Sequence, residues 1–233
     1  MGILRELFFP RPTCAVCGGP ADADGLCQKC RLLPYRLPRC QNCGNLLADL
    51  HSLCPYCSRG IRFSYRKAVG LYPYENRLRK NIWRLKYYNR TSLARPFGLL
   101  LSEAVPNLFA GVYFDLLLPV PISAARLQRR GYNHCELLTN VMAAETGLVY
   151  QPYALRKVRD TPPLKDQSRD NRFRLLRDAF VAEPELVRQK TILLVDDIFT
   201  SGATADSASR TLRLAGAKAV YVLTLATTLQ KYE

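Results

Sequence analysis

Two adjacent carboxylates stand in a setting that could bind a sugar phosphate. Residues 192–205 read ILLVDDIFTSGATA, in which four apolar residues lead into Asp196 and Asp197. A buried parallel strand delivers its last residues to the carboxyl edge of a sheet, where ligands bind in open α/β folds. The hydroxyls and the glycine that follow open the next helix, so backbone N–H groups there can enclose a phosphate. A sugar phosphate would fill this cup and donate its vicinal hydroxyls to the carboxylates.

Other protein classes carry an apolar strand that ends in two aspartates. A Walker B strand needs a P-loop of the form G-x-x-x-x-G-K-[ST], and a dinucleotide fold needs GxGxxG; the sequence contains neither. A phospho-receiver domain would place the aspartates near its start, whereas Asp197 lies close to the end of 233 residues. The remaining alternative is a strand that ends in a capped turn without a ligand.

Eight of the nine cysteines form four C-x-x-C pairs, and this spacing is typical of zinc knuckles. Nine residues separate the first two pairs, ten separate the last two, and Gly18 and Gly44 each follow a pair. We therefore expect two successive ribbons, each holding one structural Zn²⁺ with four thiolates. Redox motifs, disulfides and an interleaved pairing of the four pairs are the alternatives, and His51 could replace one thiolate. The expected metal ligands are Cys14, Cys17, Cys27, Cys30, Cys40, Cys43, Cys54 and Cys57.

The order of apolar patterns predicts an α/β fold with two domains. Residues 1–60 form the double zinc ribbon, and residues 61–233 alternate between strand and helix patterns, which implies a parallel sheet flanked by helices. A mobile loop with a short helix is expected at 156–177. The predicted strands are 65–74, 113–121, 191–196 and 218–226, and the predicted helices are 75–89, 133–146 and 203–215.

The charge balance favours a polyanionic partner. Lys and Arg number 34 against 19 Asp and Glu, a formal net charge of +15. Residues 62–95 carry most of their charge as Lys and Arg, with aromatic residues between them, and this mixture suits single-stranded nucleic acid. Arg79, Lys80 and Lys86 are the candidate contacts, unless the aromatics fill the core beneath a helix. No apolar run approaches the ~20 residues of a membrane span, so the cytoplasm is the expected compartment.

Taken together, the motifs resemble one known family. ILLVDDIFTSGAT is similar to the phosphoribosyl pyrophosphate (PRPP) motif of type I phosphoribosyltransferases. Its combination with the cysteine pairs, LKYYNR (85–90), PVP (119–121) and RLQRRGYN (126–133) resembles the ComF family, which is associated with natural transformation. The resemblance covers nearly the whole chain and implies a type I phosphoribosyltransferase-like sheet behind the zinc ribbons.

The resemblance also implies roles for individual residues. PRPP would bind with Mg²⁺, which PRPP itself would largely hold. The residues expected to act in catalysis are Asp196, Asp197, Arg126 and Arg130. The residues expected to contact PRPP are Val120, Pro121, Ile122 and Ser123 at the pyrophosphate, Asp196 and Asp197 at the ribose, and Thr200, Ser201, Gly202, Ala203 and Thr204 at the 5′-phosphate.

Two functions follow from the resemblance. One is transfer of phosphoribose to an acceptor that the sequence does not identify, in association with the DNA-uptake machinery. The alternative is a non-catalytic protein that handles single-stranded DNA and uses PRPP for regulation. The chain departs from the family pattern at His134, Leu164 and Leu175, where Gln, Gln and Asn are usual. These departures bear on turnover more than on PRPP binding.

Overall fold

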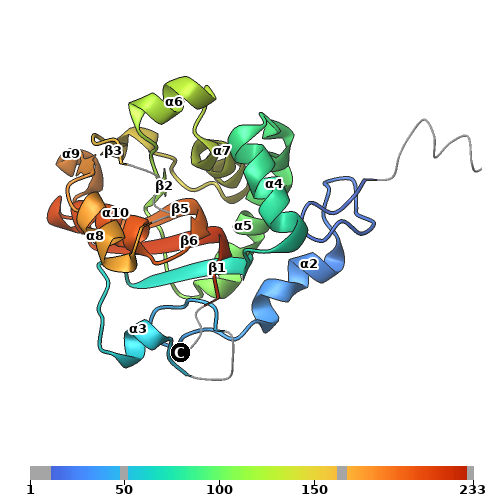
Figure 1. Ribbon diagram of the computed structural model, residues 1–233, viewed down its shortest axis with the longest axis horizontal. Coiled ribbons are helices and arrows are strands. Elements are labelled where there is room, and N and C mark those ends of the chain that lie inside the picture. The colour runs from blue at the N-terminus through green and yellow to red at the C-terminus, as the bar shows by residue number, and fades with distance from the viewer. Residues whose placement is uncertain (1–11, 48–51, 162–166, 230–233) are drawn as a thin grey trace, which may run out of the picture.

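A four-stranded parallel sheet forms the centre of the molecule (Figure 1). The computed structural model describes residues 12–47, 52–161 and 167–229. The strand order is β1-β6-β5-β2. A smaller antiparallel sheet pairs β3 with β4. The strands are β1 (Lys67–Pro73), β2 (Leu116–Pro119), β3 (Leu155–Lys157), β4 (Phe180–Ala182), β5 (Thr191–Phe199) and β6 (Ala219–Thr227).

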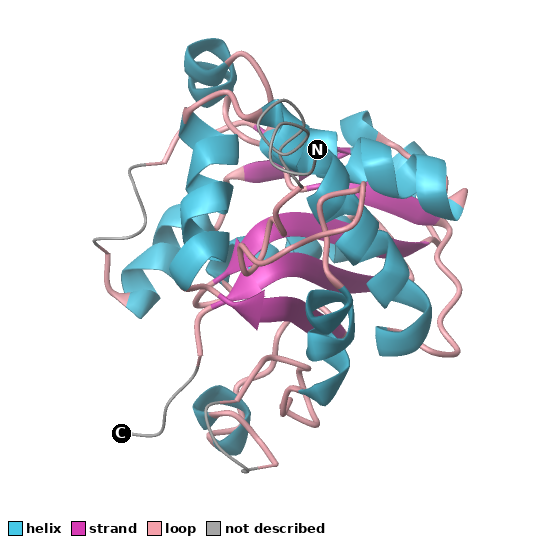
Figure 2. Cartoon of the chain, turned by 90° about the vertical axis from the view of Figure 1, so that its right-hand side faces the viewer, coloured by secondary structure: helices cyan, strands magenta, loops and turns pink. Residues whose placement is uncertain are grey.

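Helices cover both faces of the parallel sheet, as Figure 2 shows. α4 (Asn76–Tyr87), α5 (Ala94–Leu108) and α7 (His134–Thr146) pack on one face. α8 (Arg169–Leu176) and α10 (Ala203–Leu214) pack on the other. The parallel sheet flanked by helices that the sequence predicts is therefore confirmed. The shorter helices are α2 (Gln28–Leu32), α3 (Pro55–Ser58), α6 (Ala124–Arg130) and α9 (Pro184–Val187).

Alternate residues of each strand enter two separate cores. Leu193 and Val195 of β5 pack beneath α5 and α7, whereas Ile192 and Leu194 pack beneath α10. Successive side chains of a strand point to opposite faces, so a strand buried on both faces is apolar at every position. This explains why ILLV is a continuous apolar run.

The N-terminal cysteine groups share these two cores. Cys14 and Cys30 pack with the residues of the α4–α5–α7 face, and Cys43 and Cys57 pack with those of the α10 face. Hydrogen bonds also join both groups to the edge strand β1. The N-terminal segment therefore packs on both faces of the sheet around β1. The domain boundary at residue 60 stays a prediction.

The longer elements agree with the sequence patterns except in two regions, and the short elements β3, β4, α6 and α9 were not predicted. The apolar run 113–121 yields only the short strand Leu116–Pro119, and the helix Ala94–Leu108 has no predicted counterpart. Pro96 and Pro106 obscure this helix in the sequence, although Pro96 lies in its first turn, where proline is tolerated. Among the described residues, no helix is long and apolar enough to cross a membrane.

Candidate functional site

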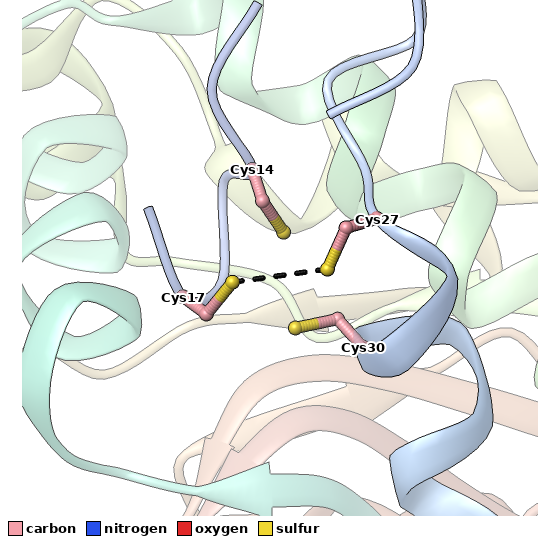
Figure 3. Close-up of side chains that lie close together, drawn as sticks. All are labelled: Cys14, Cys17, Cys27 and Cys30. Carbon is pink, nitrogen blue, oxygen red and sulfur yellow. Dashed lines mark hydrogen bonds between the residues drawn. The ribbon is translucent and has the colours of Figure 1, made fainter. Parts of the chain in front are cut away.

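The eight paired cysteines form two groups of four thiols in sequential order. Cys14, Cys17, Cys27 and Cys30 make the first group, drawn in Figure 3, and the second contains the other four. Within each group, the candidate ligand atoms lie within 4.8 Å of one another. The sequential pairing is therefore found, not the interleaved one. His51 lies outside the described residues.

The two groups repeat one backbone pattern. Cys14 N donates to Gly19 O at 2.8 Å, and Cys40 N donates to Asn45 O at 2.8 Å. Gly18 and Gly44 adopt the left-handed conformation at φ 87° and 81°, which glycine reaches without steric cost. This turn beneath each first pair of thiols is the one that the sequence predicts.

The sulfur positions fit a tetrahedral metal better than a disulfide. Cys17 Sγ lies 3.7 Å from Cys27 Sγ, and Cys43 Sγ lies 3.7 Å from Cys54 Sγ. A disulfide bond measures about 2.0 Å, whereas sulfurs about 2.3 Å from one tetrahedral metal lie about 3.8 Å apart. Each group could therefore hold one zinc ion with no open position.

A cavity of about 620 Å³ lies at the carboxyl edge of the parallel sheet. It brings together ten of the residues that the sequence predicts for PRPP binding or catalysis. β5 and the start of α10 provide one side of it, and the segment after β2 provides another. The ten residues are Val120, Pro121, Ile122, Arg126, Arg130, Asp196, Asp197, Thr200, Ser201 and Thr204.

Asp197 is the more deeply buried of the two carboxylates, at 3% exposure. It forms an ion pair with Lys86 of α4, and its Oδ1 lies 3.5 Å from His134 Nε2 of α7. Burial alone would raise the pKa of Asp197, but the charges of Lys86 and His134 hold that pKa well below its usual range. Asp197 is therefore a carboxylate at neutral pH and contacts side chains of two helices, α4 and α7.

Asp196 has a different environment. Its Oδ1 accepts hydrogen bonds from Asp197 N at 2.9 Å and from Cys135 Sγ at 3.3 Å. Burial, followed by the charge of Asp197, raises the pKa of Asp196 to about 7. The adjacent aspartates thus differ in charge near neutral pH, because only Asp197 has a cation in contact.

Five basic side chains line the same cavity. Lys157 of β3 donates to Thr161 Oγ1 at 3.1 Å, and Arg126 donates to Thr161 O at 2.9 Å. Burial, followed by the charge of Arg126, lowers the pKa of Lys157 to about 8. The positive charge exceeds that of the two carboxylates, so the cavity suits a polyanion. The five are Lys86, Arg126, Arg130, Lys157 and Arg172.

The turn between β5 and α10 has the shape expected of a phosphate cup. Gly202 caps α10 with φ 80°, and a Cβ there would lie 2.8 Å from the Phe199 ring. Ala203 N lies 3.5 Å from Ser201 Oγ. Glycine is thus required at this position, and Thr200, Ser201 and Thr204 line the cavity around it.

Some predicted site residues lie outside the cavity lining. Ser123 is buried, and its hydroxyl donates to Asp160 Oδ1 at 2.7 Å. Gly202 and Ala203 belong to the turn at the start of α10 but do not line the cavity. Arg79 and Lys80 lie on the exposed side of α4.

Lys86, by contrast, lines the cavity and forms an ion pair with Asp197. Sequence reasoning assigned Lys86 to nucleic acid and did not include His134 or Lys157. Lys86 stands within LKYYNR and His134 follows RLQRRGYN, so both were close to recognised motifs. Lys157 lies in a charged stretch without periodicity and carried no signal. Leu175 is half-buried in α8, and Leu164 lies outside the described residues.

The second cysteine group reaches the cavity through the segment that follows it. Tyr56 of α3 lines the cavity. Ser64 N donates to Asp206 Oδ1 of α10 at 2.6 Å, and the Tyr65 ring packs edge-on against Phe199. The segment between the cysteines and β1 therefore supports the turn that holds Gly202.

Comparison with known proteins gives relatives over most of the chain. "DNA utilization protein YhgH" of Salmonella typhimurium is 30% identical over 224 residues, which are 93% of this chain and 97% of that protein. "Competence protein F" of Haemophilus influenzae is 29% identical over 209 residues, 87% of this chain and 90% of that protein. "Competence protein ComFC" of Streptococcus pneumoniae is 26% identical over 209 residues, 88% of each chain. No family model matches the chain.

Solved structures resemble the fold more distantly. The allosteric regulatory enzyme of purine biosynthesis has 23% identity and a TM-score of 0.39, covering 60% of this chain and 29% of that one. Adenine phosphoribosyltransferase from Saccharomyces cerevisiae has 16% identity and a TM-score of 0.38, covering 58% and 71%. Both likenesses are too distant to indicate a ligand or a reaction.

The fold and the cavity define an α/β protein with a cavity at the carboxyl edge of a parallel sheet, preceded by two four-cysteine groups. With 30% identity across nearly the full length of the Salmonella relative, the chain belongs to the ComF family of competence and DNA utilization proteins.

The environment of Asp196 predicts a pH-dependent stability. Because its folded pKa is raised to about 7, from 3.8, the unfolded chain loses this proton first as the pH rises. The free energy of unfolding should therefore fall between pH 4 and pH 7 in the wild type relative to Asp196→Asn, by on the order of 2 kcal/mol for a half-buried group. Urea unfolding across this range measures the difference, and a difference that does not vary with pH would contradict the assignment.

Proposed function

We propose that this chain binds PRPP in the cavity. The 5′-phosphate would occupy the turn at residues 200–204, the ribose hydroxyls would donate to Asp196 and Asp197, and the pyrophosphate would face residues 120–123. One observation carries the proposal: two vicinal carboxylates and five cations converge in one cavity beside a helix N-terminus. A ligand with both a diol and several phosphates matches that distribution of charge.

The same arrangement suits transfer of the phosphoribosyl group. When pyrophosphate leaves C1′, negative charge grows on the leaving group and the ribose becomes cation-like. Arg126, Arg130 and Lys157 lie where they can neutralise the leaving charge, and the carboxylates can hold the ribose in place. No side-chain nucleophile is needed for this step.

Two kinds of metal would accompany this function. Mg²⁺ prefers oxygen ligands, and Asp196 with Asp197 offers oxygens next to those of PRPP. Bound Mg²⁺ would neutralise part of the pyrophosphate charge. The two four-cysteine groups would each hold a structural Zn²⁺. Free thiols in this arrangement fit a reducing compartment such as the cytoplasm.

The relatives suggest the process in which the chain acts. Their names refer to competence and to DNA utilization. We therefore place the proposed PRPP-dependent activity in the uptake or use of DNA, with the DNA-uptake machinery as the partner.

A second candidate function is the handling of single-stranded DNA without transfer. Its support is an exposed aromatic cluster on the last turns of α4: Trp83, Tyr87 and Tyr88 are 49%, 60% and 59% exposed. Trp83 packs against both tyrosines, and Arg79 and Lys80 lie on the same helix. Exposed rings among cations can stack bases and neutralise phosphates.

For PRPP binding, we expect Asp197→Asn to weaken affinity by at least about 100-fold, because the ribose would lose a charged acceptor worth roughly 3 kcal/mol. Titration calorimetry with PRPP and Mg²⁺ measures this, and the zinc held by the two cysteine groups should be unchanged. Asp115→Asn is the matched control, since Asp115 precedes β2 at the opposite edge of the sheet. Equal PRPP affinity in the two variants would overturn the site.

For turnover, we expect pyrophosphate release when the protein is incubated with PRPP, Mg²⁺ and a panel of nucleobases and other amine acceptors. Release above the rate without acceptor identifies the acceptor and supports transfer. Tight PRPP binding without release from any acceptor would favour the non-catalytic candidate.

For DNA, we expect salt-sensitive binding of a fluorescent single-stranded oligonucleotide. Arg79→Ala with Lys80→Ala should weaken it and reduce the salt slope by about 0.7 for each lost phosphate contact. Lys190→Ala with Lys218→Ala is the control, because these exposed lysines lie at the opposite edge of the sheet. Lys86→Ala should mainly affect PRPP, given its contact with Asp197. Equal losses from both double variants would argue against α4 as the DNA surface.

A further inference from the structure

A third group of metal-binding side chains lies inside the cavity. His134 and Cys135 open α7, and Asp196 and Asp197 end the apolar run of β5. One ligand atom of each lies within 4.8 Å of the other three. Three of the residues are buried and Asp196 is half-buried. The group is separate from both four-cysteine sets.

Three of the distances within this group match those of a tetrahedral site. Cys135 Sγ lies 3.3 Å from Asp196 Oδ1 and 3.6 Å from His134 Nε2, and His134 Nε2 lies 3.5 Å from Asp197 Oδ1. Ligands about 2.0–2.3 Å from a tetrahedral zinc are separated by about 3.3–3.8 Å. Small side-chain shifts would therefore centre an ion between the four atoms.

The donor set selects the class of metal. A thiolate and an imidazole favour zinc and similar transition metals, whereas Mg²⁺ prefers six oxygens. The site is thus chemically different from one for the Mg²⁺ that would accompany PRPP. His134 contributes the imidazole of this donor set.

The surrounding charges balance such a complex. A thiolate and two carboxylates around a divalent ion leave one negative charge, and the Lys86 ammonium lies on Asp197 to offset it. Arg130 Nη1 now lies 2.6 Å from His134 Nδ1. Coordination through Nε2 would place the ring proton on Nδ1, so Arg130 would give up this contact. The thiol proton of Cys135 would pass to solvent.

We propose that His134, Cys135, Asp196 and Asp197 form a binding site for a divalent transition metal such as Zn²⁺. The ion occupies the carboxylates that would otherwise hold the ribose, so metal and PRPP exclude each other. The metal site itself stands on the geometry, and only the competition with PRPP rests on the proposed function.

The metal count tests the site directly. Full-length protein is dialysed against buffered free Zn²⁺, and metal per chain is measured by mass spectrometry. We expect a third zinc beyond the two of the cysteine groups in the wild type, and two in Cys135→Ser and in His134→Gln. The two retained zincs also show that each variant has folded. Cys135→Ser keeps a hydroxyl able to donate to Asp196 while removing the thiolate.

Cobalt provides a second readout with protein that holds zinc at its two cysteine groups and none at the third site. Added Co²⁺ should give a thiolate charge-transfer absorption in the wild type that Cys135→Ser lacks. A wild type that takes up no third ion, or a third ion that persists in Cys135→Ser with at least about a tenth of the wild-type affinity, would overturn the site.

The competition is measured as the apparent Kd of PRPP with Mg²⁺, with and without free Zn²⁺. Zinc should raise the Kd about 10-fold or more in the wild type and much less in Cys135→Ser. If zinc instead binds PRPP itself, the apparent Kd should rise equally in the wild type and in Cys135→Ser. That result would overturn the competition but would not affect the metal count. If PRPP does not bind even without zinc, the proposed function fails and the third zinc is still counted.

Discussion

The ion pair between Lys86 and Asp197 is the contact on which the site depends. A carboxylate exposed by only 3% would cost several kcal/mol to bury without a partner. Its partners come from α4 and α7, which are far from β5 in the sequence. The charge of one aspartate therefore fixes where two helices meet the carboxyl edge of the sheet. Asp196 has no such cation in contact and keeps its proton to a higher pH.

The cysteine groups provide the second constraint. β1 is an edge strand, and edges are exposed to unwanted pairing unless they are covered. Here Cys43 O accepts from Ala68 N at 2.7 Å, and Cys30 O accepts from Tyr72 Oη at 2.7 Å, so the groups cover β1 from its two faces. The segment that follows the second group contacts α10, because Ser64 N donates a hydrogen bond to Asp206 Oδ1. The cysteine groups and the turn that holds Gly202 are thus parts of one packed unit.

Sequence patterns located the carboxylates, the turn before α10 and the cysteine sets because each is local: a strand end, a helix start or a C-x-x-C turn. They could not show that Lys86 turns inward. Helical periodicity assigns Lys86 to a face beside Leu85 and Ile82 but does not say which residue that face meets. His134 was missed for the same reason, since it contacts Asp197 of another segment. Lys157 contacts Thr161, only four residues away, but stands in a charged stretch without periodicity. The α5 helix was missed because its prolines resemble breakers.

The arrangement also limits what can bind. Before a ligand arrives, the charge of Asp197 is matched by Lys86, so a neutral diol would have to compete with that ion pair for the carboxylate. A diol that also carries phosphates would offer Lys86 a phosphate as a new ionic partner. Its hydroxyls could then donate hydrogen bonds to Asp197 in place of Lys86. If PRPP is the ligand, sugar recognition and phosphate recognition are therefore coupled through Lys86. A transition metal would act differently, because it would add its own charge to that of Lys86 on Asp197 and leave the ion pair in place.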